Sequence, residues 1–117
     1  MVGVEVLQTH SNLVGESLSP GYAQYLLATD AQLVDIRSPA EFDHGALAGA
    51  MNLPIEVLSY GFGYTRLNKR RPVILCGANE YRSHRAARLL AGQGFARIYY
   101  LARISHRAAV ESLKALS

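Results

Sequence analysis

The chain is poor in cysteine and in charged residues. Among its 117 residues there is one cysteine, and Asp, Glu, Lys and Arg together make up only 18%. A single cysteine excludes a disulfide within the chain and any zinc site built from several cysteines. Because half of the residues are hydrophobic, the chain has enough apolar surface for a packed core, which argues against intrinsic disorder. We therefore expect residues 1–117 to form one folded domain.

Long hydrophobic runs are also absent. No stretch approaches the roughly 18 apolar residues that a membrane-spanning helix needs. The N-terminus lacks the basic start and apolar segment of a signal peptide, and the sequence contains no internal repeat or low-complexity segment. We therefore expect a protein of the reducing cytoplasm that does not bind membranes.

The first half of the chain has almost no basic residues, and the second half has few acidic ones. Residues 1–65 carry seven acids and a single base, Arg37, which is a net charge of −6. Residues 66–117 carry eleven bases and two acids, a net charge of +9, and they include the only cysteine, Cys76. This asymmetry indicates a small anionic substrate or an acidic partner protein, and a solvated basic face without a partner explains it equally well. No nucleic-acid-binding motif is present, so we expect no nucleic acid partner.

Short hydrophobic strands alternate with helices along the chain. Ser19 followed by Pro20 is typical of a helix start, with Ser19 as the N-cap. Strands that alternate with helices predict a parallel sheet covered on both faces. We predict strands at residues 4–7, 33–36, 50–53, 73–75 and 98–101, and helices at residues 20–29, 39–43, 55–60, 82–93 and 105–116.

Cys76 lies where a buried strand gives way to a loop and a basic helix. Backbone N–H groups of such a loop, together with the helix N-terminus, stabilise an anion. The same surroundings, with arginines nearby, lower the pKa of a thiol. Open α/β folds bind their ligands at the carboxyl ends of strands. We therefore predict that Cys76 is a thiolate nucleophile and that the following residues form an anion-binding loop: Gly77, Ala78, Asn79, Glu80, Tyr81, Arg82 and Ser83.

Three segments of the chain resemble the rhodanese family. Residues 33–42, LVDIRSPAEF, resemble the family's opening strand and loop, with an Asp-x-Arg and a Glu-aromatic element. Residues 45–54, GALAGAMNLP, resemble the segment usually written GHIPGAINIP. Residues 76–95 resemble the active-site loop, its helix and the following Gly-Phe turn. Together the matches extend from about residue 19 to residue 101, in the order and spacing of a single-domain rhodanese.

This resemblance implies a fold and an activity. The fold is a three-layer α/β/α arrangement with a central, mainly parallel sheet of about five strands. Cys76 would take the outer sulfur of a small anionic donor such as thiosulfate and hold it as a persulfide. A thiol or cyanide acceptor would then remove that sulfur, and neither a metal nor an organic cofactor is needed. An acidic carrier protein is the partner that the basic half of the chain would suit.

Four residues are predicted to support Cys76. Arg82 and Arg85 lie one helical step apart after the loop and add positive charge. Asp35 and Arg37 lie at the end of a neighbouring strand. For Arg37 we favour a structural alternative, an ion pair with Glu41 that fixes the loop between them.

The chain departs from the family pattern in the length of the active loop. Arg82 follows Cys76 by six positions, where rhodaneses usually have five, and this Cys-x5-Arg spacing resembles the related cell-cycle phosphatases and rhodanese-fold arsenate reductases. A longer loop suits a tetrahedral oxyanion, which favours phosphatase or arsenate reductase chemistry as an alternative. Glu80 opposes it, since a carboxylate near the loop repels a phosphate dianion. Leu75, where the phosphatases have histidine, also opposes it.

A second departure follows the last predicted strand. The family's Leu-x-Gly-Gly-Ile appears here as residues 101–104, LARI. Arg103 in place of a glycine either projects charge into the pocket or displaces the segment. A displaced segment favours a second alternative, a non-catalytic sulfur carrier or regulatory binding module.

The remaining polar residues give weaker signals. No two histidines have the spacing of metal ligands on one element, so we expect no metal site. His84 is predicted to face solvent, with assistance in proton transfer as the alternative. Ser83 either caps the helix or donates its hydroxyl to the loop. Residues 61–64, GFGY, form either a plain connection or a lid over Cys76.

Overall fold

The described residues form one parallel β-sheet between two layers of helices. The structure is a computed structural model, and it describes residues 15–61, 66–77 and 79–101. The sheet has the strand order β1-β5-β4-β2-β3, and every pairing between neighbours is parallel. The elements are β1 Glu16–Leu18, α2 Pro20–Thr29, β2 Gln32–Asp35, α3 Pro39–Asp43, β3 Met51–Asn52, α4 Ile55–Ser59, β4 Val73–Cys76, α5 Glu80–Gly92 and β5 Ile98–Leu101.

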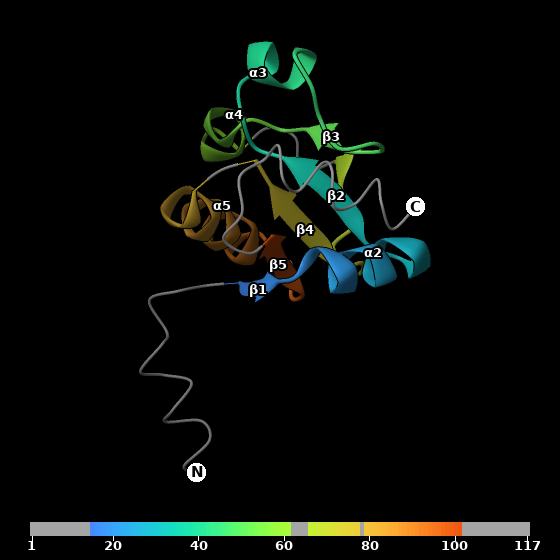
Figure 1. Ribbon diagram of the computed structural model, residues 1–117. Coiled ribbons are helices and arrows are strands. Elements are labelled where there is room, and N and C mark those ends of the chain that lie inside the picture. Colours follow the sequence, from blue (N-terminus) through green and yellow to red (C-terminus); the bar gives the residue numbers. More distant parts are fainter. Residues whose placement is uncertain (1–14, 62–65, 78, 102–117) are drawn as a thin grey trace.

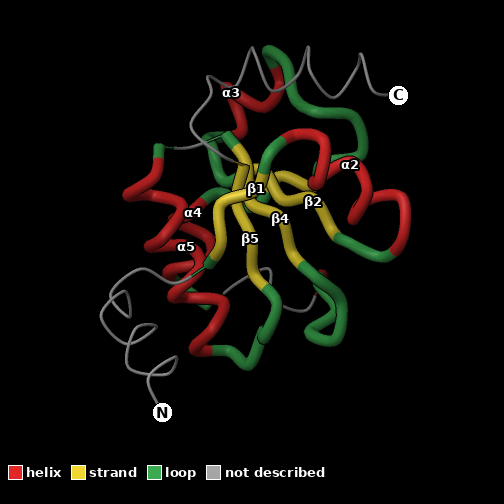
Figure 2. Tube along the Cα trace, turned by 60° about the horizontal axis from the view of Figure 1, so that its bottom comes forward, coloured by secondary structure: helices red, strands yellow, loops and turns green. Residues whose placement is uncertain are grey.

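The helices cover both faces of the sheet. Helix α2 lies on one face, and α4 and α5 lie together on the other (Figure 1, Figure 2). This is the three-layer α/β/α fold with a five-stranded parallel sheet that the sequence predicts. No helix in the described ranges combines the length and the apolar character needed to cross a membrane.

Alternating side chains along the strands divide the core into two clusters. In β4, Val73 and Leu75 belong to the cluster under α4 and α5, whereas Ile74 and Cys76 belong to the cluster under α2. This division follows from the period of two that a strand imposes on its side chains. All four side chains of β4 are buried, because the strand lies in the middle of the sheet with helices on both sides. Cys76 therefore points toward the α2 layer.

Local sequence signals account for the starts of the first helices. The Ser19 side chain accepts a hydrogen bond from the N–H of Tyr22 at 3.3 Å, and Pro20 occupies the first helical turn. Ser38 and Glu41 form a reciprocal capping box at the start of α3. Such caps satisfy N–H groups that have no partner inside the helix. The predictions of α2, α3 and the strand at residues 98–101 are confirmed.

The bounds of β2, β3, β4, α4 and α5 differ from the prediction by one or two residues, and one strand was missed. Helix α5 begins at Glu80 rather than at residue 82, because Asn79 accepts a hydrogen bond from the N–H of Arg82 at 2.8 Å and caps the helix. Strand β1 was not predicted. Its three residues lack the β-branched and aromatic side chains that mark a strand, and the parallel pairing with β5 defines it. The strand predicted at residues 4–7 and the helix predicted at residues 105–116 lie outside the described residues.

Candidate active site

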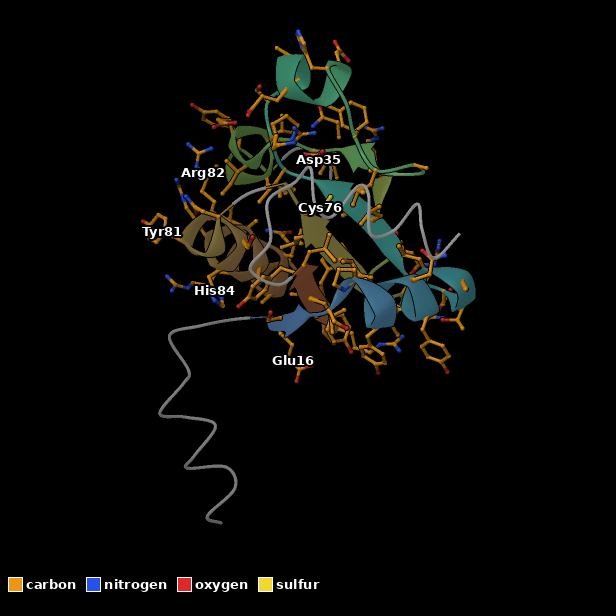
Figure 3. The ribbon with its side chains drawn as sticks, in the orientation of Figure 1. Glu16, Asp35, Cys76, Tyr81, Arg82 and His84 are labelled. Atoms are coloured by element: carbon orange, nitrogen blue, oxygen red, sulfur yellow. The ribbon has the colours of Figure 1, made fainter. Side chains whose placement is uncertain are left out.

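Cys76 and Asp35 lie side by side at the carboxyl edge of the sheet. Each is the last residue of its strand, and the two are register partners in the β2–β4 pairing. Figure 3 shows them as neighbours at the same end of the sheet. Cys76 is 2% exposed and Asp35 is fully buried. The buried thiol therefore has a buried carboxylate next to it.

Asp35 forms a bidentate ion pair with Arg37. Nη2 of Arg37 lies 2.9 Å from Oδ2 of Asp35, and Nε lies 3.1 Å from Oδ1. The backbone N–H of Arg37 donates to the same Oδ1 at 2.9 Å, and Nη2 also donates to the carbonyl oxygen of Gly45 at 2.6 Å. Hydrogen bonding to Asp35 raises the pKa of Arg37 above its ordinary value. The pair thus joins the end of β2 to the loop that leads to β3.

The ion pair predicted between Arg37 and Glu41 is wrong. The Glu41 carboxylate instead accepts hydrogen bonds from the backbone N–H of Ser38 at 3.2 Å and from its hydroxyl at 3.1 Å. These bonds lower the pKa of Glu41. Arg37 turns back toward Asp35 because that carboxylate is buried, and a buried charge needs a partner more than an exposed one does.

Gly77 packs directly against this ion pair. Its φ of +90° lies in the left-handed region, which glycine adopts without steric conflict. A Cβ atom at this position would lie 2.8 Å from Oδ1 of Asp35 and 2.8 Å from Cγ of Arg37. The residue after Cys76 must therefore lack a side chain, and the ion pair sets where the backbone leaves the sheet.

Burial governs the ionisation of Cys76. Removal of the side chain from water raises the pKa of the thiol above its ordinary value, and the Asp35 carboxylate raises the pKa further. The Arg37 guanidinium lowers the pKa, but its effect is smaller. The predicted lowering of the thiol pKa is therefore wrong for this arrangement. The physical reason is that burial disfavours the charged thiolate and that the Asp35 carboxylate adds to this effect, which together outweigh the charge of Arg37.

The predicted anion-binding loop is short, and several of its side chains point outward. Asn79 is the N-cap of α5, so Ser83 lies within the helix and does not cap it. Ser83 is buried, whereas Tyr81 is 75% exposed and Arg82 is exposed. Figure 3 shows Tyr81 and Arg82 on the side of α5 that is turned away from Cys76.

The functional roles of the predicted site residues stay predictions. Arg85 is exposed on α5, so a ligand dissolved in the solvent can reach its guanidinium. Ala78, the side chain of Glu80, residues 62–64 of the segment 61–64 (a connection or a lid) and the changed segment at residues 102–104 lie outside the described residues. Within the described ranges, no three His, Cys, Asp or Glu side chains are grouped so that they could hold a metal ion.

His84 is buried, contrary to the prediction that it faces solvent. It is 5% exposed, and its Nε2 lies 3.2 Å from the hydroxyl oxygen of Tyr100 on β5. The two rings meet edge to face, with centroids 4.8 Å apart. Its helical spacing from Ala87 was a signal for burial, because residues three apart share one helix face. The side chain therefore helps to join α5 to β5.

The buried ion pair is tested by a double-mutant cycle. We expect Arg37→Met to lower the free energy of unfolding by about 3 kcal/mol, since it leaves the Asp35 charge buried without a partner. In the double variant with Asp35→Asn, the loss should be smaller than the sum of the single losses. Urea unfolding measures each value. Arg71→Met, which removes an exposed pair with Asp30, is the control and should change stability by about 1 kcal/mol or less. If the losses of unfolding free energy from the Asp35 and Arg37 substitutions simply add in the double variant, the two side chains are not coupled.

The close packing at Gly77 is tested by a pair of glycine variants. Gly77→Ala should lower the free energy of unfolding by about 1–3 kcal/mol from backbone strain alone, and contact with Asp35 adds to this. Gly92→Ala is the matched control, because Gly92 lies in α5 with open space around it. That change should raise stability by about 0.5–1 kcal/mol. Equal effects of the two substitutions in thermal unfolding would disprove the proposed contact.

Comparisons with known proteins agree with this fold. The rhodanese-like domain model matches residues 19–103. The chain is 38% identical over 89 residues to an uncharacterised protein, YqhL, of Bacillus subtilis, a match that covers 76% of this chain and 64% of that protein, so under two thirds of its length. It is 36% identical over 84 residues to thiosulfate sulfurtransferase GlpE of Ectopseudomonas mendocina, covering 72% of this chain and 75% of that protein.

Solved structures show the same fold. The single-domain sulfurtransferase RDL2 of Saccharomyces cerevisiae superposes with a TM-score of 0.69 at 16% identity, covering 86% of this chain and 93% of that one. The Alr3790 protein of Anabaena superposes with a TM-score of 0.67 at 22% identity, covering 86% and 87% of the two chains. The family match extends from Ser19 through β2, β4 and α5, and so includes Asp35, Arg37 and Cys76. The chain therefore belongs to the rhodanese-like domain family.

Proposed function

We propose that the protein is a sulfurtransferase that carries sulfane sulfur on Cys76. The observation that carries this proposal is the position of the chain's single cysteine, at the carboxyl end of a central strand and directly before the short connection into α5. Thiosulfate is the donor that we propose, because a similar protein of Ectopseudomonas mendocina is a thiosulfate sulfurtransferase. The acceptor is a thiol or cyanide.

The reaction has two displacement steps at sulfur. In the first step, the Cys76 thiolate attacks the outer sulfur of thiosulfate, the bond between the two donor sulfurs breaks, and sulfite leaves with the electron pair. In the second step, the acceptor attacks the outer sulfur of the persulfide, and the Cys76 thiolate is released. Backbone N–H groups at the start of α5 are suited to stabilise the anions that form.

The burial of Cys76 adds a requirement to this mechanism. A thiosulfate ion must reach a sulfur atom that is 2% exposed, and the thiol must lose a proton that burial holds in place. The proposal therefore includes exposure of Cys76 to solvent when the donor binds. Arg37 is the described residue whose positive charge favours the thiolate. Its partner Asp35 limits that effect.

The same burial favours one second candidate, a sulfur carrier or regulatory binding module. A buried thiol with a raised pKa is a poor nucleophile toward a free small molecule, so sulfur would instead come from a partner protein. Exposed Arg82, Arg85 and Arg88 on α5 suit an acidic partner. Phosphatase or arsenate reductase chemistry has less support, because Arg82 is exposed and turned away from Cys76 (Figure 3).

The ionisation of Cys76 predicts its pH dependence. A free thiol has a pKa of about 8.5, so its rate of alkylation by iodoacetamide levels off about one pH unit above that value. The rate for Cys76 should keep rising beyond this point, because the buried thiol gives up its proton at higher pH. Mass spectrometry measures the rate at each pH. The unfolded thiol ionises before the buried one, so the fold loses stability as pH rises above the pKa of the free thiol. Circular dichroism must therefore show that the protein is folded at each pH. A rate that levels off about one pH unit above 8.5, as for a free thiol, would contradict the raised pKa of Cys76.

The sulfur transfer itself is tested by intact-protein mass. Incubation with thiosulfate should add the mass of one sulfur atom to the wild type and none to Cys76→Ser. Cyanide should then remove that mass and release thiocyanate. A folded wild type with a free thiol that gains no sulfur from thiosulfate, but gains it from a persulfidated carrier protein, would select the carrier function. A phosphate or arsenate adduct on Cys76 would select the oxyanion chemistry.

A further inference from the structure

A second concave site lies at the opposite end of β2 from Asp35. It is a hollow of about 510 Å³ between the second half of α2, the start of β2 and the edge strand β3. Its apolar wall includes Leu27, Ala28 and Met51. None of the residues 76–83 lines it, and Cys76 lies at the other end of the strands (Figure 3). The hollow is therefore separate from the candidate active site.

Hydrogen bonds attach a basic segment to this hollow. Nε2 of Gln32 donates to the carbonyl oxygen of Asn68 at 2.8 Å, and the N–H of Asn68 donates back to Oε1 of Gln32 at 2.7 Å. This reciprocal pair holds the segment of residues 66–71 against the start of β2. Gln32 and two arginines of that segment, Arg66 and Arg71, line the hollow.

The two arginines retain unused donors. Nε of Arg71 donates to the Asp30 carbonyl oxygen at 2.8 Å and lies 3.0 Å from Oδ1 of Asp30. These bonds fix the direction of the guanidinium while its two terminal nitrogens make no hydrogen bond in the described part of the chain. Arg66 makes no hydrogen bond or ion pair with any described residue. No described acidic residue lines the hollow. Asp30 compensates the charge of Arg71 from outside it, so the uncompensated positive charge of the hollow comes from Arg66.

This combination of groups selects a class of ligand. Guanidinium groups bind carboxylate and phosphate through paired N–H donors. The leucine, alanine and methionine side chains offer an apolar surface beside them. A volume of this size lies in the range of roughly 300–1,000 Å³ that small-molecule sites occupy. We propose that the hollow binds a small organic anion, with its carboxylate or phosphate head on Arg66 and Arg71 and its apolar body against Leu27, Ala28 and Met51.

Three probes separate the contributions of head and body. Octanoate carries both, octanol carries the apolar body alone, and inorganic phosphate carries the charge alone. Each is titrated into the isotope-labelled full chain and followed by NMR. Octanoate should shift the signals of Gln32, Met51 and Arg71 and leave Gly77 unchanged. Octanol and phosphate should each bind about tenfold more weakly or worse, because each lacks one set of contacts.

Charge-matched variants test the two arginines. The double variant Arg66→Gln, Arg71→Gln should weaken octanoate binding by about tenfold or more. Arg85→Gln with Arg88→Gln removes the same charge from α5 and should leave the affinity unchanged. Circular dichroism shows whether each variant is folded, and Arg66→Gln alone serves if the double variant is not. Arg66→Gln alone should also weaken octanoate binding.

Three results would overturn the proposal. The first is that octanol binds as tightly as octanoate. The second is that the Arg66 and Arg71 double variant and the Arg85 and Arg88 double variant lose the same amount of octanoate affinity. The third is that octanoate changes NMR signals over the whole chain. Removal of both hollow arginines should leave sulfur loading of Cys76 by thiosulfate unchanged, since neither residue lies near it. The test of anion binding in the hollow is therefore independent of whether Cys76 transfers sulfur.

Discussion

The candidate active site depends on one buried ion pair. Asp35 has no exposure to solvent, and its charge is compensated by the Arg37 guanidinium and by the Arg37 backbone N–H. Removing one partner of such a pair leaves a buried charge, which costs about 3–5 kcal/mol. The pair lies under Gly77, where no side chain fits. It thereby links three parts of the chain: the end of β2, the loop at Gly45 and the backbone that leaves Cys76.

This ion pair also explains how the uneven charge of the sequence is used. The first 65 residues contain a single base, Arg37, and the fold places that base in the ion pair beside Cys76. Among the described residues, the charges that act on the thiol are therefore those of this compensated pair. Much of the positive charge of the second half lies elsewhere, on the exposed side of α5 and in the segment of residues 66–71. Charge that appears in sequence to surround the cysteine instead faces solvent and the hollow beside α2.

The position of Cys76 carries opposing physical effects. The sheet places its side chain in the apolar cluster under α2, which disfavours the thiolate. The following connection leads into the N-terminus of α5, whose N–H groups favour an anion. A sulfur atom held in such a place is protected from solvent. In the sulfur transfer that we propose, this protection would keep other thiols from consuming the persulfide.

The sequence by itself determined the fold and the place of the cysteine. Alternating strands and helices, the Ser19 and Ser38 caps and the single Cys76 after β4 are local patterns, and local hydrogen bonds and side-chain periodicity produce them. Only the tertiary structure decided the partner of Arg37, the contact of His84 with Tyr100, and the pairing of β1 with β5. It also decided the raised pKa of the Cys76 thiol, because that pKa depends on desolvation and on a carboxylate 41 positions earlier in the chain. These properties depend on which residues the sheet brings together, and burial and charge pairing between distant segments are not written in any local pattern.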